Sequence, residues 1–314
     1  YTSFLSLGAN GIGTGETAPE AYTDEVKASF KDYNDAAVIL LTRFGGEGFD
    51  LPRTSFTEVT IETFRSSNMY SALMGMMGNN EEAAFALFCQ ISGVEPNTKG
   101  PVEGRTDMNE HYLELDDYEK ALIDMASENF DKVILVLNTG NPLELKEIEE
   151  GDKVDSVLWV GYPGARGFNS VGKIIAGAIT PSGHTVDTYA ADFTKDPTFM
   201  NFSKNSPAGN QYLDQTGALA DPARYMVEYE EGIYSGYRYW ETRGYTDGED
   251  WYEQNVVYPF GYGLSYTQFR REVDFPEISE LEADGEITVS VKITNVGEYE
   301  GKDVVQLYYS APYY

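Results

Sequence analysis

The stretch AAVILLTRFGGEGFD, residues 36–50, joins an apolar run to a loop in which three glycines surround one glutamate. The run from Ala36 to Leu41 lacks polar alternation, which is typical of a strand buried on both faces of a parallel sheet. Ligands of such sheets bind beyond the carboxyl ends of the strands, and Glu47 follows this strand at that end. The stretch therefore predicts an α/β fold and, in Glu47, a candidate functional residue.

Apolar runs and amphipathic segments alternate further along the chain. The runs 133–137 and 157–160 predict two more buried strands. Apolar residues recur at helical spacing from Tyr118 to Met125, behind a capping-box pattern at 116–119, and 171–179 predicts another helix. This alternation predicts an open, mostly parallel sheet with helices on both faces, an α/β sandwich.

The pattern changes after about residue 268. Apolar and polar residues alternate from Ile287 to Ile293, a turn follows, and Val304 to Tyr309 predicts another strand. This is typical of an antiparallel β-sandwich, but about 45 residues are too few for a closed sandwich of ~100. We therefore expect an α/β domain over 1–268 and the start of a β-sandwich domain over 269–314.

Composition excludes several classes of partner and ligand. The 314 residues include 22 Lys and Arg against 52 Asp and Glu, a net charge of −30, so nucleic acid and anionic membrane surfaces are repelled. No apolar run approaches the ~20 residues of a membrane span. Two histidines and one cysteine argue against a zinc site. Glu16 stands where a dinucleotide-binding glycine pattern needs its third glycine. We predict no metal site.

Two interpretations of the glycine loop are open from its residues alone. Glycines let the backbone approach a ligand closely. A carboxylate presented there and partly desolvated has a raised pKa, so it can donate a proton near neutrality. The simpler interpretation is a solvated turn in which Glu47 has no chemical role.

The loop also resembles a known catalytic segment. LTRFGGEGFD is similar to the acid/base loop of glycoside hydrolase family 3, the β-glucosidase family, whose pattern is roughly R-x-S-G-E-G-x-D. The matching positions are Arg43, Gly46, Glu47, Gly48 and Asp50, and Gly45 replaces the usual serine. Segments 133–145, 154–189, 228–242 and 256–269 are also similar to this family, whose last domain is fibronectin type III-like.

The resemblance implies a retaining hydrolysis of terminal β-linked sugars in an oligosaccharide or β-glucoside, without metal or organic cofactor. Glu47 would be the general acid/base, and its four matching neighbours would support the loop. The family's nucleophile is an Asp in an S-D-W-like motif of a (β/α)8 barrel, and no such motif occurs here. We therefore expect the barrel on a missing part of the same chain or on a partner chain, and no activity from these residues alone.

One segment departs from the family. Residues 54–109 are longer than the family needs, and they predict a helical insertion rich in methionine. Met69, Met74, Met76 and Met77 would either line an adaptable contact surface, for example in a homo-oligomer, or belong to a small core of the insertion. The rival function is a non-catalytic carbohydrate- or protein-binding module that uses this surface.

Overall fold

The computed structural model describes residues 16, 18–43, 56–58, 61–65, 67, 69–91, 99–101, 111–201, 229, 231–276 and 284–309. Contacts divide the chain into unit 1, Tyr1–Pro163 with Asp187–Pro259, and unit 2, Gly164–Val186 with Phe260–Tyr314. The expected boundary between residues 268 and 269 stays a prediction. Among the described helices, none combines the length and the apolar character that crossing a bilayer requires.

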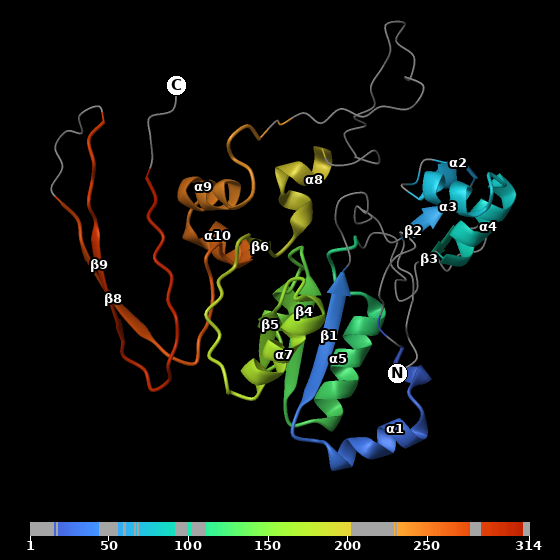
Figure 1. Ribbon diagram of the computed structural model, residues 1–314, viewed down its shortest axis with the longest axis horizontal. Helices are drawn as coiled ribbons and strands as arrows, with labels where there is room; N and C mark the ends of the chain where they lie inside the picture. Colours follow the sequence, from blue (N-terminus) through green and yellow to red (C-terminus); the bar gives the residue numbers. More distant parts are fainter. Residues whose placement is uncertain are drawn as a thin grey trace, which may run out of the picture. The chain divides into compact units, whose positions relative to one another are not determined.

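A parallel sheet forms the centre of unit 1 (Figure 1). Its strands are β1 (Ala37–Arg43), β4 (Val133–Thr139) and β5 (Ser156–Trp159), in the order β1-β4-β5. The register pairs Ala37 with Val133 and Arg43 with Thr139, so β1 and β4 end at the same edge. The three apolar runs therefore form the predicted parallel sheet.

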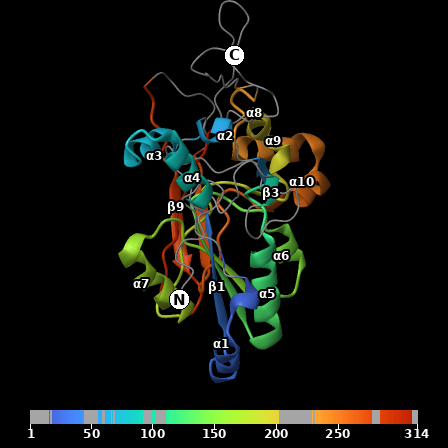
Figure 2. The same ribbon diagram turned by 90° about the vertical axis from the view of Figure 1, so that its right-hand side faces the viewer.

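Helix α5 (Asp117–Asn129) lies along β1 and β4, as Figures 1 and 2 show. The predicted capping box is present: Asp116 accepts a hydrogen bond from the Glu119 N–H, and the Glu119 carboxylate accepts one from the Asp116 N–H. Its buried face contributes to the main core, whose buried members are Leu41, Leu115, Ile123, Ala126, Val133, Leu135, Leu137, Leu143, Leu145, Ile148 and Tyr189. Burying this apolar stripe fixes the helix against the sheet.

The insertion has a core of its own. Its helices α2 (Ile61–Arg65), α3 (Tyr70–Met76) and α4 (Glu81–Ile91) lie between β2 (Phe56–Glu58) and β3 (Lys99–Pro101), which pair antiparallel. The core comprises Phe64, Leu73, Ala84, Phe88 and Cys89, and Met69, Met74 and Met77 pack against it. Met76 is 73% exposed. Three of the four methionines thus belong to a small core, as the second interpretation proposed.

Several shorter elements complete unit 1. They are α1 (Asp24–Ser29), α6 (Lys146–Glu150), β6 (Tyr189–Ala190), α8 (Pro197–Asn201), α9 (Tyr237–Asp247), α10 (Glu249–Asn255), β7 (Val256–Tyr258) and the 3-10 turns Pro19–Ala21, Phe30–Asp32 and Phe193–Lys195. Strands β6 and β7 pair antiparallel. Trp240 is 1% exposed in a core with Ala190, Phe193 and Val256, so it is a core residue.

Unit 2 contains α7 (Gly164–Ile175) and an antiparallel pair, β8 (Phe269–Asp274) and β9 (Ser290–Asn295). The sequence placed this helix at 171–179. Gly177, with φ +72°, ends the helix earlier, because a left-handed glycine lets the following N–H groups bond back to the last carbonyls.

The strand expected over 304–309 is not formed, and β9 starts at Ser290 instead of Ile287. A strand needs a neighbour for its backbone groups, and an incomplete sandwich supplies few.

Candidate active site

The candidate site lies where β1 and β4 end together. Arg43 closes β1 and pairs in register with Thr139, the last residue of β4. Of the predicted site residues, Arg43 is described, while Gly46, Glu47, Gly48 and Asp50 lie outside the described residues. The structure therefore shows how the strand that leads into the glycine loop is held.

The side chain of Arg43 is held on all sides in the interior, with 2% of its surface exposed. Its guanidinium pairs with both carboxylate oxygens of Glu119, with Nη2 2.7 Å from Oε2. Nε and Nη2 also donate to the main-chain carbonyls of Tyr112, at 3.0 Å, and Glu114, at 3.1 Å. The centroid of the Tyr112 ring lies 5.2 Å from the guanidinium carbon. A planar, five-donor group is suited to this arrangement, and Lys could not reproduce it.

Glu119 balances the positive charge of Arg43 in the cluster that these two residues form with Tyr112 and Glu16. Burial by itself lowers the pKa of Arg43, but the charge and hydrogen bonds of Glu119, helped by Glu16 and Tyr112, raise it above its ordinary value overall. Glu119 Oε2 also accepts the Asp116 N–H at 2.8 Å. One carboxylate thus caps α5 and neutralises the residue that ends β1.

Glu16 adds a second acid to the cluster. Its Oε1 accepts the main-chain N–H of Thr42 at 3.4 Å, and its Oε2 is buried without a hydrogen-bond partner. Burial, and next the charge of Glu119, raise the pKa of Glu16 well above its ordinary value of 4.5, while Arg43 opposes the shift. Burial and the neighbouring charge of Glu119 thus both favour the protonated form of Glu16, and Arg43 opposes them.

Tyr162 joins the ends of the three strands. It follows β5, and its hydroxyl donates to the main-chain carbonyl of Arg43 at 3.2 Å. Its ring lies against Gly140, just beyond β4: a Cβ at Gly140 would be 2.6 Å from the ring carbon Cε2. Gly140 is therefore needed for this close approach.

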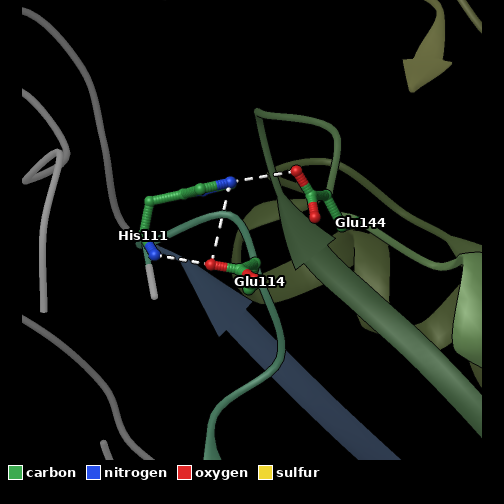
Figure 3. A group of neighbouring side chains, drawn as sticks. All are labelled: His111, Glu114 and Glu144. Carbon is green, nitrogen blue, oxygen red and sulfur yellow. Dashed lines mark hydrogen bonds and ion pairs between the residues drawn. The ribbon is translucent and has the colours of Figure 1, made fainter. Parts of the chain in front are cut away.

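His111 contacts two glutamates, Glu114 and Glu144, close to this site (Figure 3). His111 Nε2 lies 2.9 Å from Oε1 of Glu144 and 3.8 Å from Oε2 of Glu114. Those oxygens also accept main-chain N–H groups, from Phe193 and from His111 itself, each at 2.6 Å.

This set could hold a cation by its residue types, but its hydrogen bonds favour a structural role. Nδ1 of His111 accepts the Leu113 N–H at 3.3 Å, which places the ring proton on Nε2. A nitrogen that carries this proton and donates to Glu144 cannot bind a metal at the same time.

Sequence reasoning missed the partners of Arg43. Glu119 was identified for its place in the capping box, and Tyr162 for its place in a segment similar to the family. Nothing in the spacing connects either residue with Arg43, because the contacts cross between strands and a helix that are far apart in the chain.

Comparison with known proteins places the chain in a family. Residues 13–237 match the glycosyl hydrolase family 3 C-terminal domain. Beta-glucosidase A of Butyrivibrio fibrisolvens is 29% identical over 319 residues, which cover 96% of this chain and 31% of that protein. A beta-glucosidase of Ruminococcus albus is 34% identical over 200 residues, 63% of this chain and 17% of that protein. The chain thus spans less than a third of the length of these relatives.

Solved structures agree on the fold. A beta-glucosidase from Paenibacillus barengoltzii superposes with a TM-score of 0.55 at 24% identity, over 91% of this chain and 22% of that one. Beta-glucosidase 3B from Thermotoga neapolitana gives 0.52 at 22% identity, over 90% of this chain and 28% of that one. The predicted α/β sandwich with a partial fibronectin type III-like domain is confirmed. Since the family match spans well over half of its residues, this chain belongs to the glycosyl hydrolase family 3 C-terminal domain family.

Proposed function

We propose that this chain is the acid/base part of a retaining β-glycosidase that hydrolyses terminal β-linked sugars of oligosaccharides or β-glucosides. The observation that carries the proposal is the position of Arg43, the residue that precedes the glycine loop in the sequence. Arg43 is buried at the shared end of two parallel strands, where ligands of such sheets bind. The family match spans this loop.

The roles follow from the requirements of the chemistry. Glu47 would protonate the leaving oxygen in the first step and activate water in the second. Gly46 and Gly48 would give the loop the freedom to approach the sugar. Arg43 and Asp50 would support the loop, and the pairing of the Arg43 side chain with Glu119 is consistent with this role.

A retaining mechanism needs a second carboxylate about 5–5.5 Å from the first. We assign it to the (β/α)8 barrel that the family resemblance implies, on the same or a partner polypeptide. This chemistry requires neither a metal nor an organic cofactor.

The test is the Glu47→Gln variant of the full-length protein, assayed on alkyl and nitrophenyl β-glucosides. General acid assistance is worth about 10²–10⁴-fold, so kcat/KM on the alkyl glucoside should fall by that order, and much less on the nitrophenyl glucoside, whose leaving group needs little protonation. Glu25→Gln, in the first turn of α1 and exposed, is the matched control and should behave as wild type. Unchanged hydrolysis of the alkyl glucoside by Glu47→Gln would leave the loop a simple turn.

A further inference from the structure

The main-chain carbonyl of Arg43 is the last described backbone group before the glycine loop, and it has its own hydrogen bond. The Tyr162 hydroxyl donates to it at 3.2 Å. The bonds of Glu119 and the carbonyls hold the Arg43 side chain, whereas Tyr162 holds the main-chain carbonyl of Arg43. In the sequence, this residue directly precedes the glycine loop.

The Tyr162 ring is placed for this bond by its neighbours. Gly161, with φ +57°, turns the chain after β5, in a conformation that favours glycine. Its carbonyl accepts the Asn138 side-chain amide at 2.6 Å, which ties this turn to β4. Gly140 leaves room for the ring: a Cβ there would lie 3.0 Å from the Tyr162 hydroxyl oxygen. The bond therefore depends on all three strand ends.

We propose that Tyr162 is a positioning residue for Glu47, acting through the carbonyl of Arg43. The inference rests on the proposed function. Glu47 is four residues beyond Arg43, within about 14 Å along the chain, so a change in the peptide after Arg43 moves the carboxylate. Misplacement of a catalytic group by about 1 Å can cost up to ~10²-fold in rate.

The expected effect is smaller than this limit. Tyr162 is 53% exposed, and a neutral hydrogen bond has a modest net worth, so its loss should cost about two- to tenfold. The loss should appear only where proton transfer limits the rate.

The experiment uses Tyr162→Phe in the full-length protein, which keeps the ring and removes the hydroxyl. We expect kcat/KM on an alkyl β-glucoside to fall about two- to tenfold, with kcat/KM on a dinitrophenyl β-glucoside unchanged. Gly140→Ala should give the same pattern, because its methyl group would displace the ring. Tyr266→Phe is the matched control, since it removes a similar bond, to the carbonyl of Ile174 at 2.9 Å within unit 2.

A double-mutant cycle shows whether Tyr162 acts through Glu47. In the Glu47→Gln background, Tyr162→Phe should cause no further loss on the alkyl glucoside, because the group that it positions is gone. Equal losses on both glucosides, or a further loss in the Glu47→Gln background, would overturn the inference. If Glu47→Gln is impaired while Tyr162→Phe equals wild type, the inference fails and the proposed function stands. If Glu47→Gln is fully active, both fail.

Discussion

Breaking the buried pair between Arg43 and Glu119 on one side should strongly destabilise the edge of the sheet that carries the candidate site, because it leaves a buried charge uncompensated. In Glu119→Gln, one carboxylate oxygen becomes an amide that donates hydrogen bonds. If the amide nitrogen replaces Oε1, it faces Nη1 of Arg43, which also donates. If it replaces Oε2, it faces both Nη2 of Arg43 and the Asp116 N–H. Either orientation breaks at least one bond and leaves the Arg43 charge buried without its counter-ion.

Removing one partner of a buried ion pair costs about 3–5 kcal/mol. With a urea dependence of about 3 kcal/mol per molar for a chain of this size, the unfolding midpoint should fall by about 1–1.7 M. The assay is urea unfolding followed by tryptophan fluorescence. All three tryptophans, Trp159, Trp240 and Trp251, belong to unit 1, so the signal reports the unit that contains the pair.

The control is an exposed ion pair. Lys153 Nζ lies 2.6 Å from Asp124 Oδ1, with both side chains more than half exposed. Such a pair is worth about 0–1 kcal/mol, so Asp124→Asn should shift the midpoint by less than about 0.3 M. A shift for Glu119→Gln no larger than that of Asp124→Asn would refute the reasoning, because it would mean that Arg43 is not buried and paired as described.

Three further predictions follow from the structure. Because the folded-state pKa of Glu16 is raised, its contribution to stability is fully present below its ordinary pKa and is lost as the pH rises toward the folded-state value. Glu16→Gln mimics the protonated acid, so in thermal melts it should unfold as wild type near pH 4 and be more stable than wild type at pH 8. Equal melting temperatures at pH 8 would contradict the raised pKa. Replacing residues 59–98 by Asn-Gly should join β2 to β3 as a hairpin. The urea midpoint reported by tryptophan fluorescence should stay nearly unchanged, because the insertion has its own core. A large fall in the midpoint would show that the parallel sheet depends on the insertion, and a changed oligomeric state in light scattering would reveal a contact role. The isolated 314-residue chain should release no detectable nitrophenol from an aryl β-glucoside, and robust turnover with a covalent sugar trapped on one of its own residues would show that the site is not divided.

Local sequence patterns predicted the helices and strands well where residues close together in the sequence determine them. The apolar runs around Val38, Leu135 and Val157 gave the three strands of the parallel sheet. The expectation that the first strand is buried on both faces was wrong, because Val38 and Leu40 in β1 are 52% and 43% exposed. The capping box gave the start of α5 because Asp116 and Glu119 are neighbours in sequence. Both bounds of α7 and the strand at 304–309 were wrong. Gly177 ends α7 before Ile179, and the segment 304–309 pairs with no neighbouring strand among the described residues.

For the candidate site, the sequence motif indicated the candidate catalytic residue but not its structural partners. Glu47 could be selected by its motif, but the residues that hold its loop could not. Arg43 finds its counter-ion in Glu119, 76 residues away in the chain, and its carbonyl is held by Tyr162, 119 residues away. Contacts of this kind arise from the register of β1 and β4 and from the packing of α5, which no local spacing encodes.

The central claim is that Glu47 supplies the proton and then the base of a retaining hydrolysis. In the full-length Glu47→Gln variant acting on a nitrophenyl β-glucoside, the first step should proceed, while the second lacks its base and the glycosyl-enzyme accumulates. Azide needs no base to attack that intermediate, so its addition should restore turnover, with a β-glycosyl azide as the product identified by NMR. A variant that azide does not accelerate, or that forms only free sugar, would contradict the assignment of Glu47 as the acid/base.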